Sequence, residues 1–129
     1  MYLCVSWRGH WIFRNLNRGD RARFTYDVQN LWEMGTAPTL AVYHALQPVI
    51  GYLHVKGGRA GPDGGFAWRS PLRTASWPVA QIVRAAIADG VSPCICLNPS
   101  HGAVAPCDVF EDYTMQDLAQ LHQIMGTDE

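Results

Sequence analysis

The sequence contains few charged residues and no excess of either sign. Charged side chains make up 16% of the 129 residues, and the formal net charge is −1. A chain without a basic patch offers no electrostatic reason to bind nucleic acid or an anionic membrane. We therefore expect neither as a partner. The low charge indicates extensive buried surface or a face that meets another molecule.

Several motifs that would assign a chemistry are also missing. The four cysteines include no C-x-x-C pair, which argues against a zinc finger. The glycine-rich stretches match neither a dinucleotide-binding motif nor a P-loop. No apolar run is long enough to span a membrane, and no basic region opens a signal peptide. We expect a cytoplasmic protein without disulfides, in which Cys94 and Cys96 are buried free thiols.

What is present is an alternation of strand-like and helix-like segments. Apolar residues make up 48% of the chain, enough for one domain over residues 1–129. Short apolar segments bounded by turn-forming residues predict strands at 2–7, 23–28, 49–56 and 93–97. Apolar stripes predict helices at 38–46, 77–89 and 115–125, with Ser76 and Thr114 as N-caps. This rhythm is typical of parallel βαβ units in an α/β fold.

The length limits which α/β architecture the chain can form. A complete (β/α)8 TIM barrel takes about 250 residues, roughly twice the 129 found here. The fold is then either a small open α/β sheet or a partial (β/α)8 TIM barrel. The latter would be a half barrel of about four parallel strands with flanking helices.

Polar residues follow three of the predicted strands. Asp27 ends the second strand, His54 and Lys56 end the third, and Asn98 follows the fourth. Functional groups of α/β folds gather at the carboxyl ends of strands. A carboxylate, an imidazole and an amide at neighbouring strand ends suit Mn²⁺, Mg²⁺ or Co²⁺. A lysine beside such an ion could polarise a carbonyl group.

The order of these residues carries a family resemblance. Residues 23–58, RFTYDVQNLWEMGTAPTLAVYHALQPVIGYLHVKGG, resemble the second half of a xylose-isomerase-like barrel, the sugar isomerase and epimerase superfamily. In that family a strand ends in Asp, Asn follows three positions later, Gly and Pro open a helix, and the next strand ends in His-x-Lys. The matching residues here are Asp27, Asn30, Gly35, Pro38, His54 and Lys56.

The resemblance implies a metal-dependent isomerase or epimerase. It would act on a sugar or sugar phosphate by moving a proton next to a carbonyl, with Asp27, His54 and Asn98 as metal ligands. Two of the four metal ligands in the family are glutamates, which are also its usual acid and base. Ser6 and Asn98 stand at those positions here, so Lys56 or His101 becomes the candidate base. The expected substrate contacts are Arg8, His10, Asn30 and Arg59.

Three alternatives remain beside this interpretation. The long loop 57–76, which carries Arg59, is either a lid over the substrate or a solvated surface loop. The chain is either an enzyme or a non-catalytic, truncated barrel fragment that binds or oligomerises. Because four strands leave open edges, two copies could pair as a homodimer of half barrels. The last alternative is a stand-alone α/β domain, which antiparallel strands would favour.

Overall fold

The main β-sheet is parallel, and its strands lie side by side in chain order. The computed structural model describes residues 2–3, 23–98 and 107–126. Strands β2 (Arg23–Asp27), β3 (Ile50–Val55) and β6 (Ile95–Leu97) form a three-stranded parallel sheet. The two-residue strand β1 (Tyr2–Leu3) pairs with the outer side of β2, also in parallel. The predicted parallel α/β arrangement is confirmed, whereas antiparallel strands would have favoured the stand-alone domain.

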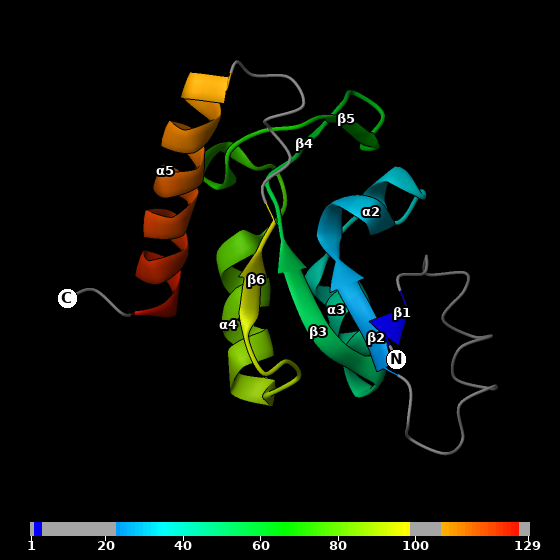
Figure 1. The fold of residues 1–129 in the computed structure, drawn as a ribbon. Helices are drawn as coiled ribbons and strands as arrows, with labels where there is room; N and C mark the ends of the chain where they lie inside the picture. Colours follow the sequence, from blue (N-terminus) through cyan, green and yellow to red (C-terminus); the bar gives the residue numbers. More distant parts are fainter. Residues whose placement is uncertain (1, 4–22, 99–106, 127–129) are drawn as a thin grey trace.

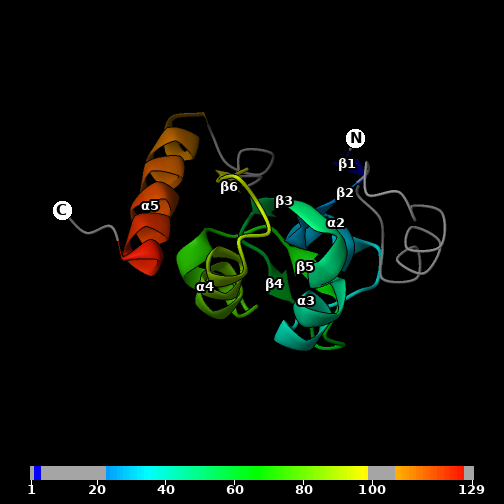
Figure 2. The same cartoon turned by 90° about the horizontal axis from the view of Figure 1, so that it is seen from below.

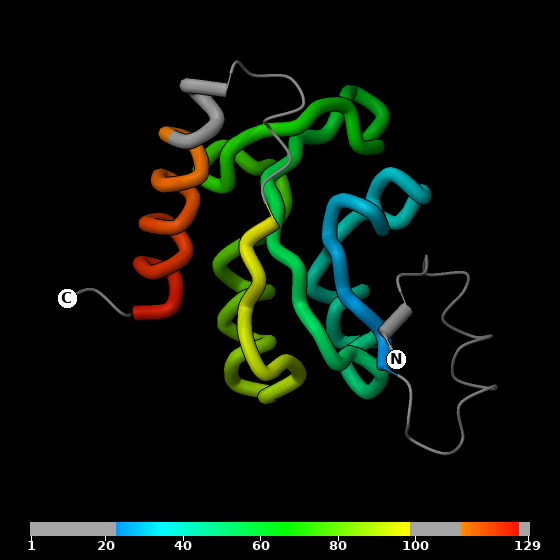
Figure 3. The backbone as a smooth tube through the Cα atoms, in the orientation of Figure 1, coloured from blue at the N-terminus to red at the C-terminus, as the bar shows by residue number. Residues whose placement is uncertain are grey.

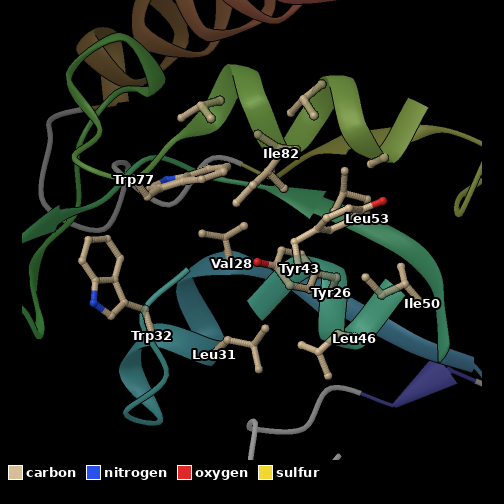
Figure 4. Packing of buried hydrophobic residues seen from close by; sticks show 14 of the residues in the cluster. Tyr26, Val28, Leu31, Trp32, Tyr43, Leu46, Ile50, Leu53, Trp77 and Ile82 are labelled. Atoms are coloured by element: carbon tan, nitrogen blue, oxygen red, sulfur yellow. The ribbon is translucent and has the colours of Figure 1, made fainter. Parts of the chain in front are cut away.

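Helices α3 (Leu40–Leu46) and α4 (Val79–Asp89) pack on one face of this sheet (Figures 1 and 2). Alternate strand residues point to opposite faces, so Tyr26 of β2 and Leu53 of β3 turn towards these helices and are fully buried. In the core between sheet and helices, the ring of Tyr26 meets the ring of Tyr43 edge-on at 6.1 Å (Figure 4). The hydrophobic core therefore lies on the helix side of the sheet.

The predicted helix at 77–89 exists, but its N-cap prediction is wrong. Helix α4 begins at Val79, after Pro78, and ends as predicted at Asp89. The next residue, Gly90, has a φ of 62°, the left-handed conformation common at helix ends. The Ser76 hydroxyl oxygen instead accepts a hydrogen bond from the backbone N–H of Ala60 at 2.7 Å. Ser76 therefore binds a residue that is distant in sequence and does not cap the helix.

The last helix, α5 (Cys107–Met125), begins well before the predicted residue 115. Thr114 therefore lies inside the helix, and its predicted capping role is wrong. The buried carboxylate of Asp117 accepts a hydrogen bond from the backbone N–H of Leu72 at 2.9 Å. That bond ties α5 to the 3-10 helix η2 (Leu72–Thr74), so Asp117 joins two elements that are distant in sequence.

Two small helical elements next to the strands were not predicted from the sequence. Helix α2 (Val28–Glu33) starts directly after β2, and the 3-10 helix η1 (Gln47–Val49) precedes β3. The long loop 57–76 contains a hairpin of β4 (Arg59–Ala60) and β5 (Phe66–Trp68), paired antiparallel. Figure 3 shows the chain running from the carboxyl end of β3 into this hairpin and back to α4. The hairpin thus lies at the carboxyl end of the sheet.

The turn from β3 into the hairpin depends on Gly57. A Cβ atom at this residue would stand 1.6 Å from the carbonyl oxygen of Ser70, so no larger residue fits. The Ser70 hydroxyl accepts a hydrogen bond from the backbone N–H of Gly58 at 2.9 Å, which fixes the same approach. In the part of the chain that the structure describes, no helix has the length and apolar character needed to cross a membrane.

Candidate functional site

The sheet face opposite α3 and α4 carries mainly polar side chains. Strand alternation places Thr25 and Asp27 of β2 on it, and Tyr52 and His54 of β3. Lys56, which follows β3, lies on the same face. So do Cys96 of β6 and Asn98, which follows β6. Most of these side chains are half-buried, whereas their neighbours on the helix side are largely buried. This polar face can therefore meet a ligand or another chain.

Four side chains meet at the carboxyl ends of β2, β3 and β6, and we call them the Asp27 cluster: Asp27, His54, Lys56 and Asn98. The Lys56 Nζ atom lies 3.0 Å from Asp27 Oδ2, and His54 Nδ1 lies 3.3 Å from the same oxygen. The Asn98 side-chain nitrogen lies 3.4 Å from His54 Nδ1. The predicted convergence of these strand-end residues is therefore observed.

Asp27 sits at the junction of β2 and α2 and uses its two carboxylate oxygens for different partners. It is the N-cap of α2, where Oδ1 accepts a hydrogen bond from the backbone N–H of Asn30 at 3.1 Å. Oδ2 faces Lys56 and His54. The residue is only 2% exposed, so its negative charge is largely removed from water. Burial makes these partners necessary for the folded state.

Lys56 supplies the positive charge that balances Asp27. It follows β3 directly and is 8% exposed. Its carbonyl oxygen accepts a hydrogen bond from the indole N–H of Trp77 at 3.0 Å, and the close approach of Gly57 to Ser70 fixes the next residue. The backbone of Lys56 is thus fixed by contacts at its carbonyl oxygen and at the next residue, which gives the ion pair a defined position.

His54 lies opposite Asp27 in the β2–β3 register. Its Nδ1 atom can donate to Asp27 Oδ2 or accept from the Asn98 amide, depending on the ring tautomer. The carboxylate favours the tautomer with the hydrogen on Nδ1, which leaves the Nε2 lone pair of the neutral ring available as a base. With 26% of its side chain exposed, His54 is the most accessible member of the Asp27–Lys56–His54 group.

Tyr52 and two cysteines lie beside the cluster on the same polar face. The Cys94 thiol donates to the Tyr52 hydroxyl at 3.5 Å, and the Tyr52 ring meets the His54 ring edge-on at 5.3 Å. The pKa of Tyr52 is raised to about 12, first by its hydrogen bond with Cys94 and next by its interaction with Cys96. Both thiols are free, as predicted, but Cys94 is exposed and Cys96 is half-buried. The prediction that they are buried is wrong because their side of the strand faces away from the helices.

The predicted metal ligands Asp27, His54 and Asn98 lie together, but the cluster as it stands does not fit a divalent ion. His54 Nδ1 lies 3.3 Å from Asp27 Oδ2 and 3.4 Å from the Asn98 side-chain nitrogen, and these distances are close to those between atoms that share one ion. The single carboxylate, however, is already paired with an ammonium group. Among the side chains that the structure describes, at residues 23–98 and 112–126, no group of three or more His, Cys, Asp or Glu is placed to hold a metal.

The other predicted site residues are divided between the hairpin, α2 and the part of the chain outside the described residues. The Arg59 Nη1 atom donates to the carbonyl oxygen of Thr74 at 2.7 Å, and its guanidinium lies 5.9 Å from the Trp68 ring. These contacts place Arg59 within its own loop. Asn30 reaches the cluster through its backbone N–H. The predicted residues outside the described ranges are Ser6, Arg8, His10 and His101.

A cavity lies at the hairpin, apart from the cluster side chains. It has a volume of about 460 Å³ and is lined by Glu33, Phe66, Ala67, Trp68 and Arg69. None of the cluster side chains lines it, so the convergence of charged and polar groups, not this cavity, defines the candidate site. The sequence did not predict that Trp77 and Ser70 support Lys56. Both contact the backbone at or near Lys56 from distant positions, and no local sequence pattern indicates such contacts.

Comparison with known proteins adds no relative: no protein-family model, curated protein or solved structure matches the chain at a significant level.

Proposed function

We propose that the Asp27 cluster binds a sugar or sugar phosphate and isomerises or epimerises it by moving a proton next to a carbonyl. The observation that carries this proposal is the meeting of Asp27, His54, Lys56 and Asn98 at the carboxyl ends of adjacent parallel strands. Active sites of (β/α) barrels are built at this edge of the sheet. The resemblance of residues 23–58 to sugar isomerases and epimerases points to the same chemistry.

The charges and donors of the cluster suggest a role for each residue. Lys56, paired with Asp27, donates a hydrogen bond to the substrate carbonyl oxygen and stabilises the negative charge that develops there. His54 removes the proton from the neighbouring carbon, which converts the carbonyl into an enediolate. Return of the proton to the same carbon from the opposite face completes epimerisation. Its delivery to the former carbonyl carbon, together with transfer of the hydroxyl proton between the two oxygens, completes isomerisation. Asp27 is a positioning residue because it orients both His54 and Lys56.

We further propose that the chain is half of a xylose-isomerase-like barrel. Strand order equal to chain order, parallel pairing and helices packed on one face support this architecture. In a closed barrel the polar face would point to the interior. Because one chain supplies half of the eight strands, a second copy is the proposed partner that completes the ring.

Hydrogen exchange tests the proposed proton transfer without knowledge of the product. The protein is incubated in D₂O with a panel of aldoses, ketoses and their phosphates, and ¹H NMR follows loss of the signal next to the carbonyl. We expect exchange with at least one sugar, and a drop of about 100-fold or more in His54→Gln and in Lys56→Gln. Gln81→Ala, on the exposed surface of α4, is the matched control.

Two outcomes decide against this function. Exchange at the wild-type rate in both cluster variants would remove the cluster from the reaction. A folded wild-type protein that exchanges none of the sugars would favour the non-catalytic barrel fragment.

A further inference from the structure

We propose that the ammonium group of Lys56 takes the place of a metal ion in the Asp27 cluster, so that the site carries its own cation. This inference deepens the proposed function and its chemical meaning rests on it, but its test needs no substrate. It predicts that the wild-type site rejects divalent ions and that removal of Lys56 creates a site for them.

The bonds of Asp27 provide the first argument. Oδ1 accepts from the backbone of Asn30, and Oδ2 is shared between Lys56 and His54. Both oxygens of the one carboxylate are therefore engaged by the chain. A divalent ion at Oδ2 would have to displace a buried ammonium group that already neutralises it.

Electrostatic repulsion provides the second argument. An ion bound about 2.1 Å from Oδ2 could lie no farther than roughly 5 Å from Lys56 Nζ, because Nζ itself stands 3.0 Å from that oxygen. Like charges at such a distance repel strongly where water is excluded. The side chains of Asp27 and Lys56 are 3% and 10% exposed, so solvent screens this repulsion poorly.

The backbone contacts of Lys56 provide the third argument. The Trp77 indole holds its carbonyl oxygen, and Asn98 donates its backbone N–H to the carbonyl oxygen of the preceding Val55 at 3.0 Å. Gly57 then turns the chain against Ser70. These contacts fix the backbone of Lys56 beside Asp27, so the ammonium group has a defined position, as a bound metal ion would have. The ligand class that suits this cation is an electron-rich oxygen, such as a carbonyl or an enediolate oxygen.

Mn²⁺ binding tests the inference directly. Titration calorimetry and electron paramagnetic resonance would measure binding to the wild type, to Lys56→Gln and to the double variant Asp27→Asn/Lys56→Gln. We expect Lys56→Gln to bind Mn²⁺ at least roughly tenfold more tightly than the wild type, because the repelling charge is gone. The double variant, which lacks both charges, is expected to bind no better than the wild type.

Thermal melting gives a second measurement, which remains informative if Lys56→Gln is less stable than the wild type. Lys56→Gln leaves Asp27 buried without its cation, so it should melt at a lower temperature, and saturating Mn²⁺ should raise that temperature by about 5 °C or more. The wild type and the double variant should not respond. The inference would be overturned if the double variant folds but Mn²⁺ does not raise the melting temperature of Lys56→Gln. Micromolar binding of Mn²⁺ by the wild type would also overturn it. Neither measurement uses a sugar, so a failure here is distinct from failure of the proposed isomerase activity.

Discussion

At the scale of single residues, two buried tyrosines of the core differ in what their hydroxyl groups contact. The Tyr43 hydroxyl donates to the carboxylate of Asp89 at 2.7 Å. The Tyr26 hydroxyl is fully buried and has no hydrogen-bond partner among the described residues. Burial raises the pKa of both groups, and Asp89 raises that of Tyr43 further. The two rings touch edge-on, so they provide a matched pair in one environment.

Removing each hydroxyl should therefore have opposite effects on the free energy of unfolding. Tyr43→Phe loses a hydrogen bond to a charged group and should destabilise the fold by about 1.5–3 kcal/mol. Tyr26→Phe removes an unsatisfied polar atom and should leave stability unchanged or raise it by about 1 kcal/mol. Urea unfolding followed by tryptophan fluorescence measures both. A clear loss of stability in Tyr26→Phe would show that its hydroxyl is satisfied in solution.

At the scale of secondary-structure elements, Asp27 connects the start of α2 with the ion pair. Asp27→Asn keeps an N-cap side chain but loses the charge, whereas Asp27→Ala loses both. We expect both variants to lose about 3–5 kcal/mol because Lys56 remains buried without a counter-charge. Asp27→Ala should lose about 1 kcal/mol more than Asp27→Asn. Chemical denaturation measures the difference between the two.

Thr39→Ala is the control for this capping contribution. The Thr39 hydroxyl caps α3 by accepting from the backbone N–H of Val42 at 3.2 Å, with no ion pair attached. Its loss should cost about 1 kcal/mol, similar to the Ala–Asn difference at Asp27. Equal stability of Asp27→Asn and Asp27→Ala would mean that the cap adds nothing beyond the charge.

The elements that the sequence predicts well are those with a long regular pattern. Helix α4 and the central strands carry enough apolar residues to be recognised, and Gly90 marks the helix end. Helix α2 was missed because its six residues are too few to show a helical period, and its first residue, Val28, favours strands. Strands β4 and β5, of two and three residues, are similarly too short. Their pairing depends on distant contacts with Ser70 and Ser76.

The candidate site was predictable in its membership but not in its bonding. Polar residues that follow neighbouring parallel strands must meet at one edge, which brings Asp27, His54 and Asn98 together. The register that pairs Asp27 with His54 is a tertiary property. The bond between Lys56 and Asp27 depends on that register, which explains why the sequence suggested a lysine beside a metal rather than a lysine bound to the carboxylate.

At the scale of the whole molecule, the polar face and the sheet edges decide the expected assembly. If two half barrels close into a ring, sedimentation equilibrium at micromolar concentration should give twice the 14.3 kDa mass of one chain. Cys96 lies on the polar face and is half-buried. Cys96→Arg would force a long cation into the closed interior and should shift the protein to monomer, since barrel interiors are tightly filled.

Gln81→Arg places the same side chain on the exposed surface of α4 and should leave the dimer intact. Both variants are compared with the wild type in the presence of a reductant, so that the free thiols cannot link chains. On an isolated sheet, Cys96→Arg would extend from an open face and change neither mass nor stability appreciably. A wild-type monomer at this concentration, or a Cys96→Arg variant that stays dimeric, would contradict closure through the polar face. The Asp27 cluster would then open directly to solvent rather than into a barrel interior.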